Sequence, residues 1–249
     1  MLHAFSGNKS RAYRYYVGHR EGLGHRVSSE DEITSIIFGP LDFLPASNNW
    51  FFWRTALTSH ETVAASGPLP GDFFDPSFTP ISCEMKFWMR RDNVEPDLVV
   101  DFLDAGGAAR SILLEVKWDA GLSGDDQLLN QWTVFQAGRH ATSLHVLLAK
   151  QTDNLELRAA PWSVDETDGR KSNRLRLLRW HGLHRDLHHV WSDALAPDPI
   201  RRWAALAAEF LSRVGIRPFV GFHQTVQLAA SIEIATDEDV AFWRNDNRF

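Results

Sequence analysis

Two apolar segments joined by a glycine pair dominate the middle of the chain. "PDLVVDFL" and "RSILLEVKW" both have the period of a β-strand, and Gly106-Gly107 between them predicts an antiparallel hairpin. Asp97, Glu115 and Lys117 lie inside these apolar runs. Because neighbouring side chains of a strand point to opposite faces, we expect the core residues on one face and the charged residues on the other.

Antiparallel pairing about this turn places Asp97 opposite residues 115 to 117, so two carboxylates and an ammonium are expected to converge. Like charges held that close are unfavourable unless a cation neutralises them, and Mg²⁺ suits a small set of carboxylates. A neighbouring lysine stabilises charge on an attacked phosphate. The set is typical of metal-assisted phosphodiester hydrolysis. A structural alternative stays open, in which Asp97 caps a strand entrance and Glu115 and Lys117 form a solvated strand face.

The elements before the hairpin begin with a helix near Ser29, in "SSEDEITSIIFGPLDFL", which Pro40 should kink or divide. Residues 45 to 80 are mixed in composition, and "SGPLPGDFFDPSFTP" within them is typical of an irregular loop. This stretch is either a domain boundary or a long connection within one domain. "ISCEMKFWMRR" then alternates as the first strand.

After the hairpin, "SGDDQLLNQWTVFQAGRH" has helical spacing and "TSLHVLLAK" has the length of a buried strand. "LELRAAPW" and "NRLRLLRW" predict further strands, and "LHRDLHHVWSDAL" and "DPIRRWAALAAEFLSRVG" predict helices. The order α, β, β, β, α, β predicts an α/β (α+β) fold with a central mixed sheet, extra strands and C-terminal helices. We expect an N-terminal arm over residues 1–27, a core over 28–160, and additional elements packed on it over 161–249.

Pro96-Asp97 and Glu115-Val116-Lys117, on a hairpin followed by a helix and a buried strand, resemble the core motif of the PD-(D/E)XK nuclease superfamily. That superfamily has the restriction-endonuclease-like fold with an αβββαβ core, and the resemblance covers roughly residues 28 to 150. It implies that Asp97 and Glu115 bind the metal and that Lys117 is the catalytic lysine.

The resemblance also implies further site residues. The family often adds an acid from the preceding helix, for which Glu32 is the best-placed candidate, although Ser29-x-x-Glu32 equally fits a capping box. Several branches carry a glutamine on the following helix, matched here by Gln127 and, one turn later, Gln131. An exposed helical glutamine is the structural alternative. Asp101 lies on the same face of the predicted strand as Asp97 and is an alternative metal ligand.

These residues predict a nuclease that depends on Mg²⁺ or Mn²⁺ and acts on DNA. Resemblance implies a role in repair or in defence against foreign DNA, and a homodimer or a larger assembly that cuts both strands. The alternative is a catalytically inactive module of the same fold that binds nucleic acid or a protein partner.

The charge distribution is uneven although the net charge is −6. Arg11, Arg14 and Arg20 alternate with tyrosines near the N-terminus, and Arg174 and Arg176 belong to a basic block over residues 170–185. Such blocks suit phosphate backbones and bases, and we expect these arginines to contact nucleic acid. A solvated arm and a strand edge protected by charge are the alternatives.

The cellular setting follows from two further features. A single cysteine excludes an internal disulfide, and no apolar run reaches the ~20 residues of a membrane span, so we expect a cytoplasmic protein that does not enter a membrane. His184 and His188 lie one helical turn apart and offer an alternative zinc site, but no zincin glutamate or cysteine cluster accompanies them. No P-loop or dinucleotide-binding glycine pattern indicates ATP or NAD.

Overall fold

A mixed β-sheet organises the part of the chain that the computed structural model describes, which comprises residues 29–59, 63–64, 73–118, 121–124, 126–136, 142–150 and 174–216. The chain divides into two units, Met1–Arg217 and Pro218–Phe249, and every described residue belongs to the first. The predicted N-terminal arm and the predicted strand "LELRAAPW" lie outside the described residues.

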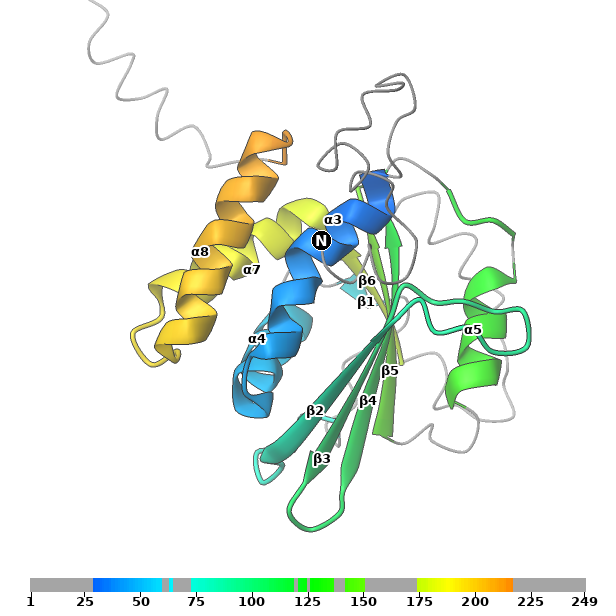
Figure 1. Cartoon of the computed structure of the whole chain (residues 1–249), viewed down its shortest axis with the longest axis horizontal. Helices are drawn as coiled ribbons and strands as arrows, with labels where there is room; N and C mark the ends of the chain where they lie inside the picture. The colour runs from blue at the N-terminus through cyan, green and yellow to red at the C-terminus, as the bar shows by residue number, and fades with distance from the viewer. Residues whose placement is uncertain are drawn as a thin grey trace, which may run out of the picture. The chain divides into compact units, whose positions relative to one another are not determined.

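Six strands of the described residues form one sheet in the order β1-β6-β5-β4-β3-β2 (Figure 1). β2, β3 and β4 are antiparallel neighbours, β4, β5 and β6 run parallel, and the short β1 is antiparallel to β6. The strands span Val63–Ala64 (β1), Pro80–Phe87 (β2), Leu98–Asp104 (β3), Ala109–Lys117 (β4), Ser143–Ala149 (β5) and Leu175–Arg179 (β6). The expected α/β architecture with a central mixed sheet is confirmed.

Helices cover both faces of this sheet (Figure 1). α5 (Gln127–Gln136) packs on one face, and the other helices lie on the opposite face. The latter are α3 (Ser29–Phe38), the 3₁₀ helix η1 (Gly39–Phe43), α4 (Ala46–Thr58), α7 (Trp180–Ser192) and α8 (Asp198–Arg213). None of the helices in the described segments is long and apolar enough to cross a membrane. The predicted succession of helix, three strands, helix and strand is present, with α4 and β1 inserted after the first helix.

The domain boundary or long connection expected over residues 45 to 80 instead begins with a helix, because residues 46–58 form α4. Its sequence, "ASNNWFFWRTALT", is rich in aromatic residues and asparagine, whose intrinsic helix propensity is low. Tertiary packing stabilises the helix instead, since Phe52, Trp53 and Ala56 are fully buried. Trp50 contacts Phe78 and Phe102 with ring centroids 4.8 and 5.1 Å apart, which attaches α4 to β3.

The β3–β4 hairpin has the predicted antiparallel register. Leu98 pairs with Leu114, and the turn at residues 105–108 uses Gly107 at φ +82°, a conformation that favours glycine. Leu98, Val100, Phe102, Leu114 and Val116 all enter the larger apolar core, shared with the helices of the α3 side. The alternate residues therefore face α5.

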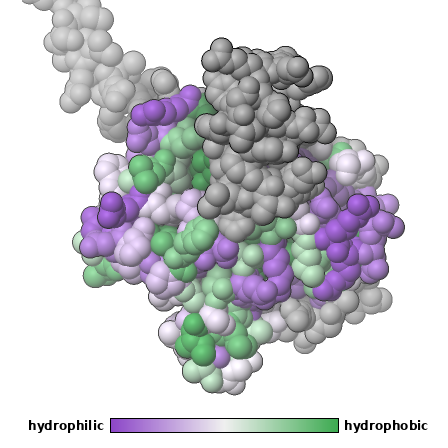
Figure 2. Space-filling view, in the orientation of Figure 1, coloured by the Kyte–Doolittle hydropathy of each residue, from purple (hydrophilic) through white to green (hydrophobic). Residues whose placement is uncertain are grey.

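The two ends of the sheet differ in surface character. Exposed apolar side chains gather where β2 begins and β3 ends, at the foot of the view in Figure 2, where Ile81 and Leu103 are exposed. The opposite end, where β4 finishes at Lys117, carries the buried charged residues described below.

Trp180 attaches the end of β4 to α7, because its indole Nε1 donates a hydrogen bond to the Lys117 carbonyl oxygen at 3.0 Å. The Trp118 and Trp180 rings meet edge to face with centroids 5.0 Å apart. We expect Trp180→Phe to lower the free energy of unfolding by about 1–3 kcal/mol, since it leaves a buried carbonyl without its donor.

Urea denaturation measures this loss, and Trp191→Phe on the same helix is the matched control because the Trp191 side chain is 48% exposed. Equal stabilities of the two variants would contradict the prediction.

Candidate active site

The charged residues of the hairpin converge at the carboxyl end of β4, on the face covered by α5. Asp97 directly precedes β3 and, one step beyond the Leu98–Leu114 pair, lies opposite Glu115. The Asp97 carbonyl oxygen accepts a hydrogen bond from Trp88 N, which extends the β2–β3 ladder to this point. Asp97, Glu115 and Lys117 are 8%, 2% and 9% exposed, so the chain buries an ionisable cluster at the edge of its core.

Asp97 is held by the backbone of the facing strand. Its Oδ2 accepts a hydrogen bond from Val116 N at 2.7 Å, while Oδ1 accepts none from the described residues. Burial raises the pKa of Asp97 well above its ordinary value, and repulsion by Glu115 raises it further; the hydrogen bond and Lys117 oppose this. The site therefore holds more negative charge than its surroundings neutralise.

Lys117 connects two carboxylates. Its Nζ lies 2.5 Å from Glu115 Oε1 and 3.2 Å from Glu30 Oε1. Burial acts to lower the pKa of Lys117, but the attraction of Glu115, Glu30 and Asp97 outweighs it and raises the pKa above the ordinary value. Lys117 is thus a protonated cation, suited to stabilising anionic charge rather than to removing a proton from water.

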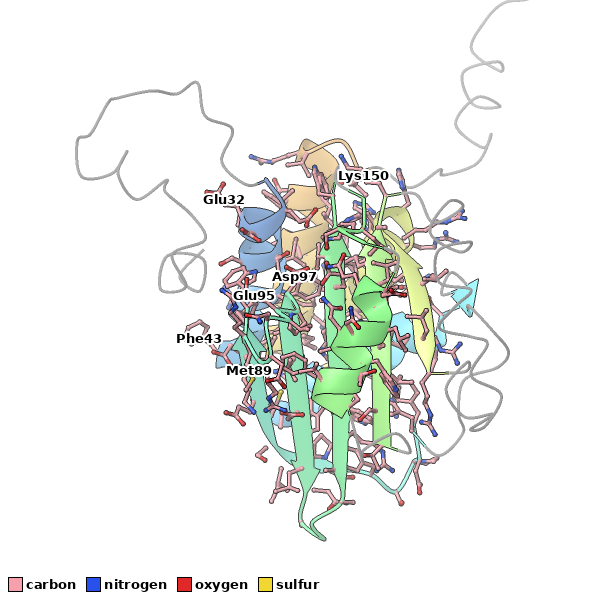
Figure 3. The ribbon with its side chains drawn as sticks, turned by 90° about the vertical axis from the view of Figure 1, so that its right-hand side faces the viewer. Glu32, Phe43, Met89, Glu95, Asp97 and Lys150 are labelled. Atoms are coloured by element: carbon pink, nitrogen blue, oxygen red, sulfur yellow. The ribbon has the colours of Figure 1, made fainter. Side chains whose placement is uncertain are left out.

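The acid from the preceding helix is Glu30, where the sequence analysis expected Glu32. Glu30 Oε2 accepts a hydrogen bond from Trp118 N at 2.9 Å in addition to the Lys117 contact. Residues two apart on a helix point about 200° away from each other, so only one of the pair can face the sheet. Figure 3 shows Glu32 on the side of α3 turned away from Asp97. The side chain of Ser29 lies outside the described set, and the capping box stays a prediction.

Two glutamines of α5 hold the Glu115 carboxylate. Gln127 Nε2 donates to Oε1 and Gln131 Nε2 donates to Oε2, both at 2.6 Å. Ser123 holds the Gln127 amide in turn, since its backbone N and its Oγ lie 2.8 and 3.0 Å from Gln127 Oε1. Burial raises the pKa of Glu115, and Lys117 opposes that rise. The structure therefore brings both predicted glutamines to the site.

His145 is a residue of this cluster that the sequence analysis missed. Its Nε2 lies 3.1 Å from Gln131 Oε1, and the ring is completely buried beside β4, where His145 pairs with Leu113. Burial lowers the pKa of His145 to about 3, so the imidazole is neutral. Because Gln131 donates to the carboxylate, its oxygen must accept from His145 Nε2, which fixes the tautomer. The available signal was a single histidine inside an otherwise apolar strand.

The remaining predicted ligands lie elsewhere. Asp101 accepts a hydrogen bond from Lys86 Nζ at 3.1 Å and is not part of the Lys117 cluster. His184 is buried, and its Nε2 lies 2.7 Å from Ser212 Oγ, so one of its two ring nitrogens contacts a hydroxyl group of α8. Within the segments that the structure describes, no three His, Cys, Asp or Glu side chains are grouped as a ready metal cage.

The predicted phosphate-binding arginines are not at this site. Arg174, which directly precedes β6, and Arg176 on β6 are 3% and 1% exposed. Leu175 and Leu177 point toward α5, so the alternate residue Arg176 points to the opposite face. Burial, and then repulsion by Arg174, lowers the pKa of Arg176 to about 10. Arg11, Arg14 and Arg20 lie outside the described residues.

No protein-family model, curated protein or solved structure matches this chain significantly.

The raised pKa of Asp97 predicts how stability depends on pH. A carboxyl whose pKa is higher in the folded chain than in the unfolded chain loses stability as pH rises from about 4 through the folded value. Asp97→Asn keeps an oxygen for Val116 N and carries no charge. With divalent cations chelated, we expect this variant to be more stable than wild type at pH 7, because it removes the carboxylate charge that burial and repulsion by Glu115 disfavour.

Thermal unfolding between pH 4 and pH 8 measures the difference, which should vanish near pH 4. Asp92→Asn is the control, since Asp92 is exposed on the β2–β3 connection. Parallel stability profiles of wild type and Asp97→Asn across this range would contradict the assignment.

Proposed function

We propose that the protein is a nuclease that depends on Mg²⁺ or Mn²⁺ and hydrolyses phosphodiester bonds in DNA. The observation that carries the proposal is the convergence of Asp97, Glu115 and Glu30 on Lys117 at the end of β4. An interior that only needed stability would not place two buried acids and a partly buried third around one ammonium, because unneutralised charge away from water is costly.

The residues present fit a hard divalent cation. Carboxylate oxygens are the ligands that Mg²⁺ prefers, and two of them with water molecules suffice, since Mg²⁺ usually keeps several waters. Asp97 Oδ1 accepts no hydrogen bond from the described residues, and Gln127 and Gln131 hold the two Glu115 oxygens in place. When bound, the metal supplies an activated water and offsets charge on the phosphate.

The chain's own side chains supply the rest of the chemistry. Lys117, protonated and tethered to Glu115 and Glu30, is placed to stabilise the negative charge that develops on the attacked phosphate. Gln127 and Gln131 orient Glu115, and the His145 contact orients Gln131. Geometry is thus fixed before substrate arrives, which reduces the reorganisation needed during the reaction.

The resemblance to the PD-(D/E)XK superfamily supports the same function. Under this proposal α3, β2, β3, β4, α5 and β5 form the αβββαβ core, with Glu30 in place of Glu32 as the helix-borne acid. Roles in repair or in defence against foreign DNA, a cytoplasmic location and a dimer that cuts both strands stay predictions of that resemblance.

Cleavage of plasmid and linear DNA tests the function directly. We expect wild type to cut with Mg²⁺ or Mn²⁺ and not with chelator, and Lys117→Ala to lower the rate about 10²-fold or more, the loss typical for removal of one charge-stabilising group. Lys86→Ala is the matched control, because Lys86 also contacts two carboxylates, Glu84 and Asp101, on the same sheet.

Three outcomes would count against the proposal or a part of it. If purified wild type cuts neither DNA nor RNA with any divalent cation, and those cations leave its melting temperature unchanged, the site does not bind metal for catalysis. DNA binding without cleavage would instead indicate the inactive binding module. Equal rates for Lys117→Ala and Lys86→Ala would remove Lys117 from the mechanism.

We infer that a second phosphate contact comes from Arg179. Lys117 pairs with Ala149, and Ala149 pairs with Arg179, so the three form a row across β4, β5 and β6. Paired residues point to the same face, which places Lys117 and Arg179 on the α5 face with the small Ala149 between them. Two strand spacings separate their backbones by about 10 Å. Lys150, 4.0 Å from the Trp118 ring centroid, adds a cation at the same sheet edge (Figure 3).

Salt dependence of DNA binding measures this contact. With divalent cations chelated, we expect Arg179→Gln to weaken binding of all sequences alike and to reduce the slope of log K against log salt by about 1. Arg213→Gln is the control, because Arg213 is exposed on α8 and pairs with Glu209. Identical salt slopes for the two variants would refute a phosphate contact at Arg179.

A further inference from the structure

An open cleft of about 500 Å³ adjoins the Glu115 carboxylate, between α5 and the β2–β3 connection. Gln127 and Gln131, which hold Glu115, form its inner wall, so any group in the cleft lies next to the candidate catalytic cluster. Its volume falls within the range of ordinary small-molecule sites. The other lining residues are Asn93, Val94, Glu95, Ser123, Gly124, Asp126 and Asn130.

The outer wall is a tight β-turn at Arg91–Val94. Arg91 N and Val94 N each bond the other residue's carbonyl oxygen, at 2.9 and 2.8 Å, and the central residues Asp92 and Asn93 have φ of +49° and +61°. Positive φ at both central positions defines a type I′ turn, for which Asn, Asp and Gly are preferred. The turn therefore has a defined shape and presents the Asn93 amide to the cleft.

An apolar contact fixes the distance between the two walls. Met89 and Val94 of the connection pack with Phe135 and Val134 of α5, and the Arg91 guanidinium lies 5.2 Å from the Phe135 ring centroid. Figure 3 shows the connection that carries Glu95 beside α5, with Asp97 at its base. The cleft is thus a built feature rather than a gap between loose segments.

The charged side chains that line the cleft, Glu95 and Asp126, are both acidic and disfavour a phosphate. The nearest cations of the connection contact other groups, Arg91 the Phe135 ring and Arg90 the Asn93 side chain, and Lys117 and Arg179 lie on the sheet. An anion would be repelled, but an uncharged group with hydrogen-bond donors and acceptors would not. The exposed Asn130 side chain makes no hydrogen bond to the described residues, and Asn93 makes one long contact, 3.4 Å from Arg90.

Amide side chains facing an anion-repelling cleft match the edge of a nucleobase, since asparagine and glutamine present paired donor and acceptor groups. We propose that this cleft binds a nucleobase next to the scissile phosphate, and that Asn130 and Asn93 select which base is accepted. The inference rests on the proposed nuclease function. It assigns the phosphates of the substrate to the Lys117–Arg179 row and the selected base to α5 and the connection.

Sequencing the cut ends of randomised DNA pools, single-stranded and duplex, tests this selection. We expect wild type to prefer particular bases at one position beside the cut. Asn130→Ala, at an exposed helix position that tolerates alanine, and Asn93→Gly, which suits the type I′ turn, should each lower that preference about fivefold or more. Thr133→Ala, exposed on α5 and outside the cleft lining, is the matched control and should keep the wild-type preference.

The outcomes separate this inference from the proposed function. If wild type cuts no pool, the nuclease function itself fails. If wild type cuts without base preference beside the cut, the nuclease function stands and the base-binding cleft is refuted. The same conclusion follows if Asn130→Ala and Asn93→Gly both keep the wild-type base preference and the wild-type melting temperature. Loss of the preference in the two cleft variants but not in Thr133→Ala supports the inference.

Discussion

The antiparallel register of β3 and β4 is the constraint on which the site depends. The Leu98–Leu114 pair sends alternate residues into the larger core and leaves Asp97 facing Glu115 on the other face. A slip of one residue would exchange the two faces and place the carboxylates in the apolar core, at a cost that the fold could not sustain. The same hydrophobic pattern therefore specifies both the hairpin and the convergence of the acids.

The site also carries a cost in stability that the surrounding contacts limit. Three acids around one ammonium leave net negative charge in a poorly solvated place, as the raised pKa values of Asp97 and Glu115 reflect. Backbone amides, glutamine amides and Lys117 compensate in part. In a site that binds a cation, the negative charge that lowers stability without the cation also increases the affinity for it.

Sequence alone predicted the parts of the site that follow from strand periodicity, and missed those set by tertiary placement. The convergence of Asp97, Glu115 and Lys117 follows from the two-residue period, whereas Gln127 and Gln131 were implied by the resemblance to the nuclease superfamily. Glu30 and Glu32 share one acidic helical turn, and only the docking of α3 on β4 selects Glu30. α4 was missed because packing, not propensity, stabilises it, and the arginines of β6 could not be assigned to a face before the register with β5 was known.

The parallel pairing of β4 and β5 explains why α5 lies beside both the Glu115 cluster and the cleft. Parallel neighbours need a crossover, so the chain must leave the carboxyl end of β4, form a helix and return to the start of β5. The first turns of that helix necessarily lie near the end of β4, where Glu115 and Lys117 are located. Gln127 and Gln131 of α5 hold Glu115. Asn130, next to Gln131 on the same helix, lines the cleft. Under the proposed function, a change in this outer surface alters base preference while Gln127 and Gln131 keep the Glu115 carboxylate in place.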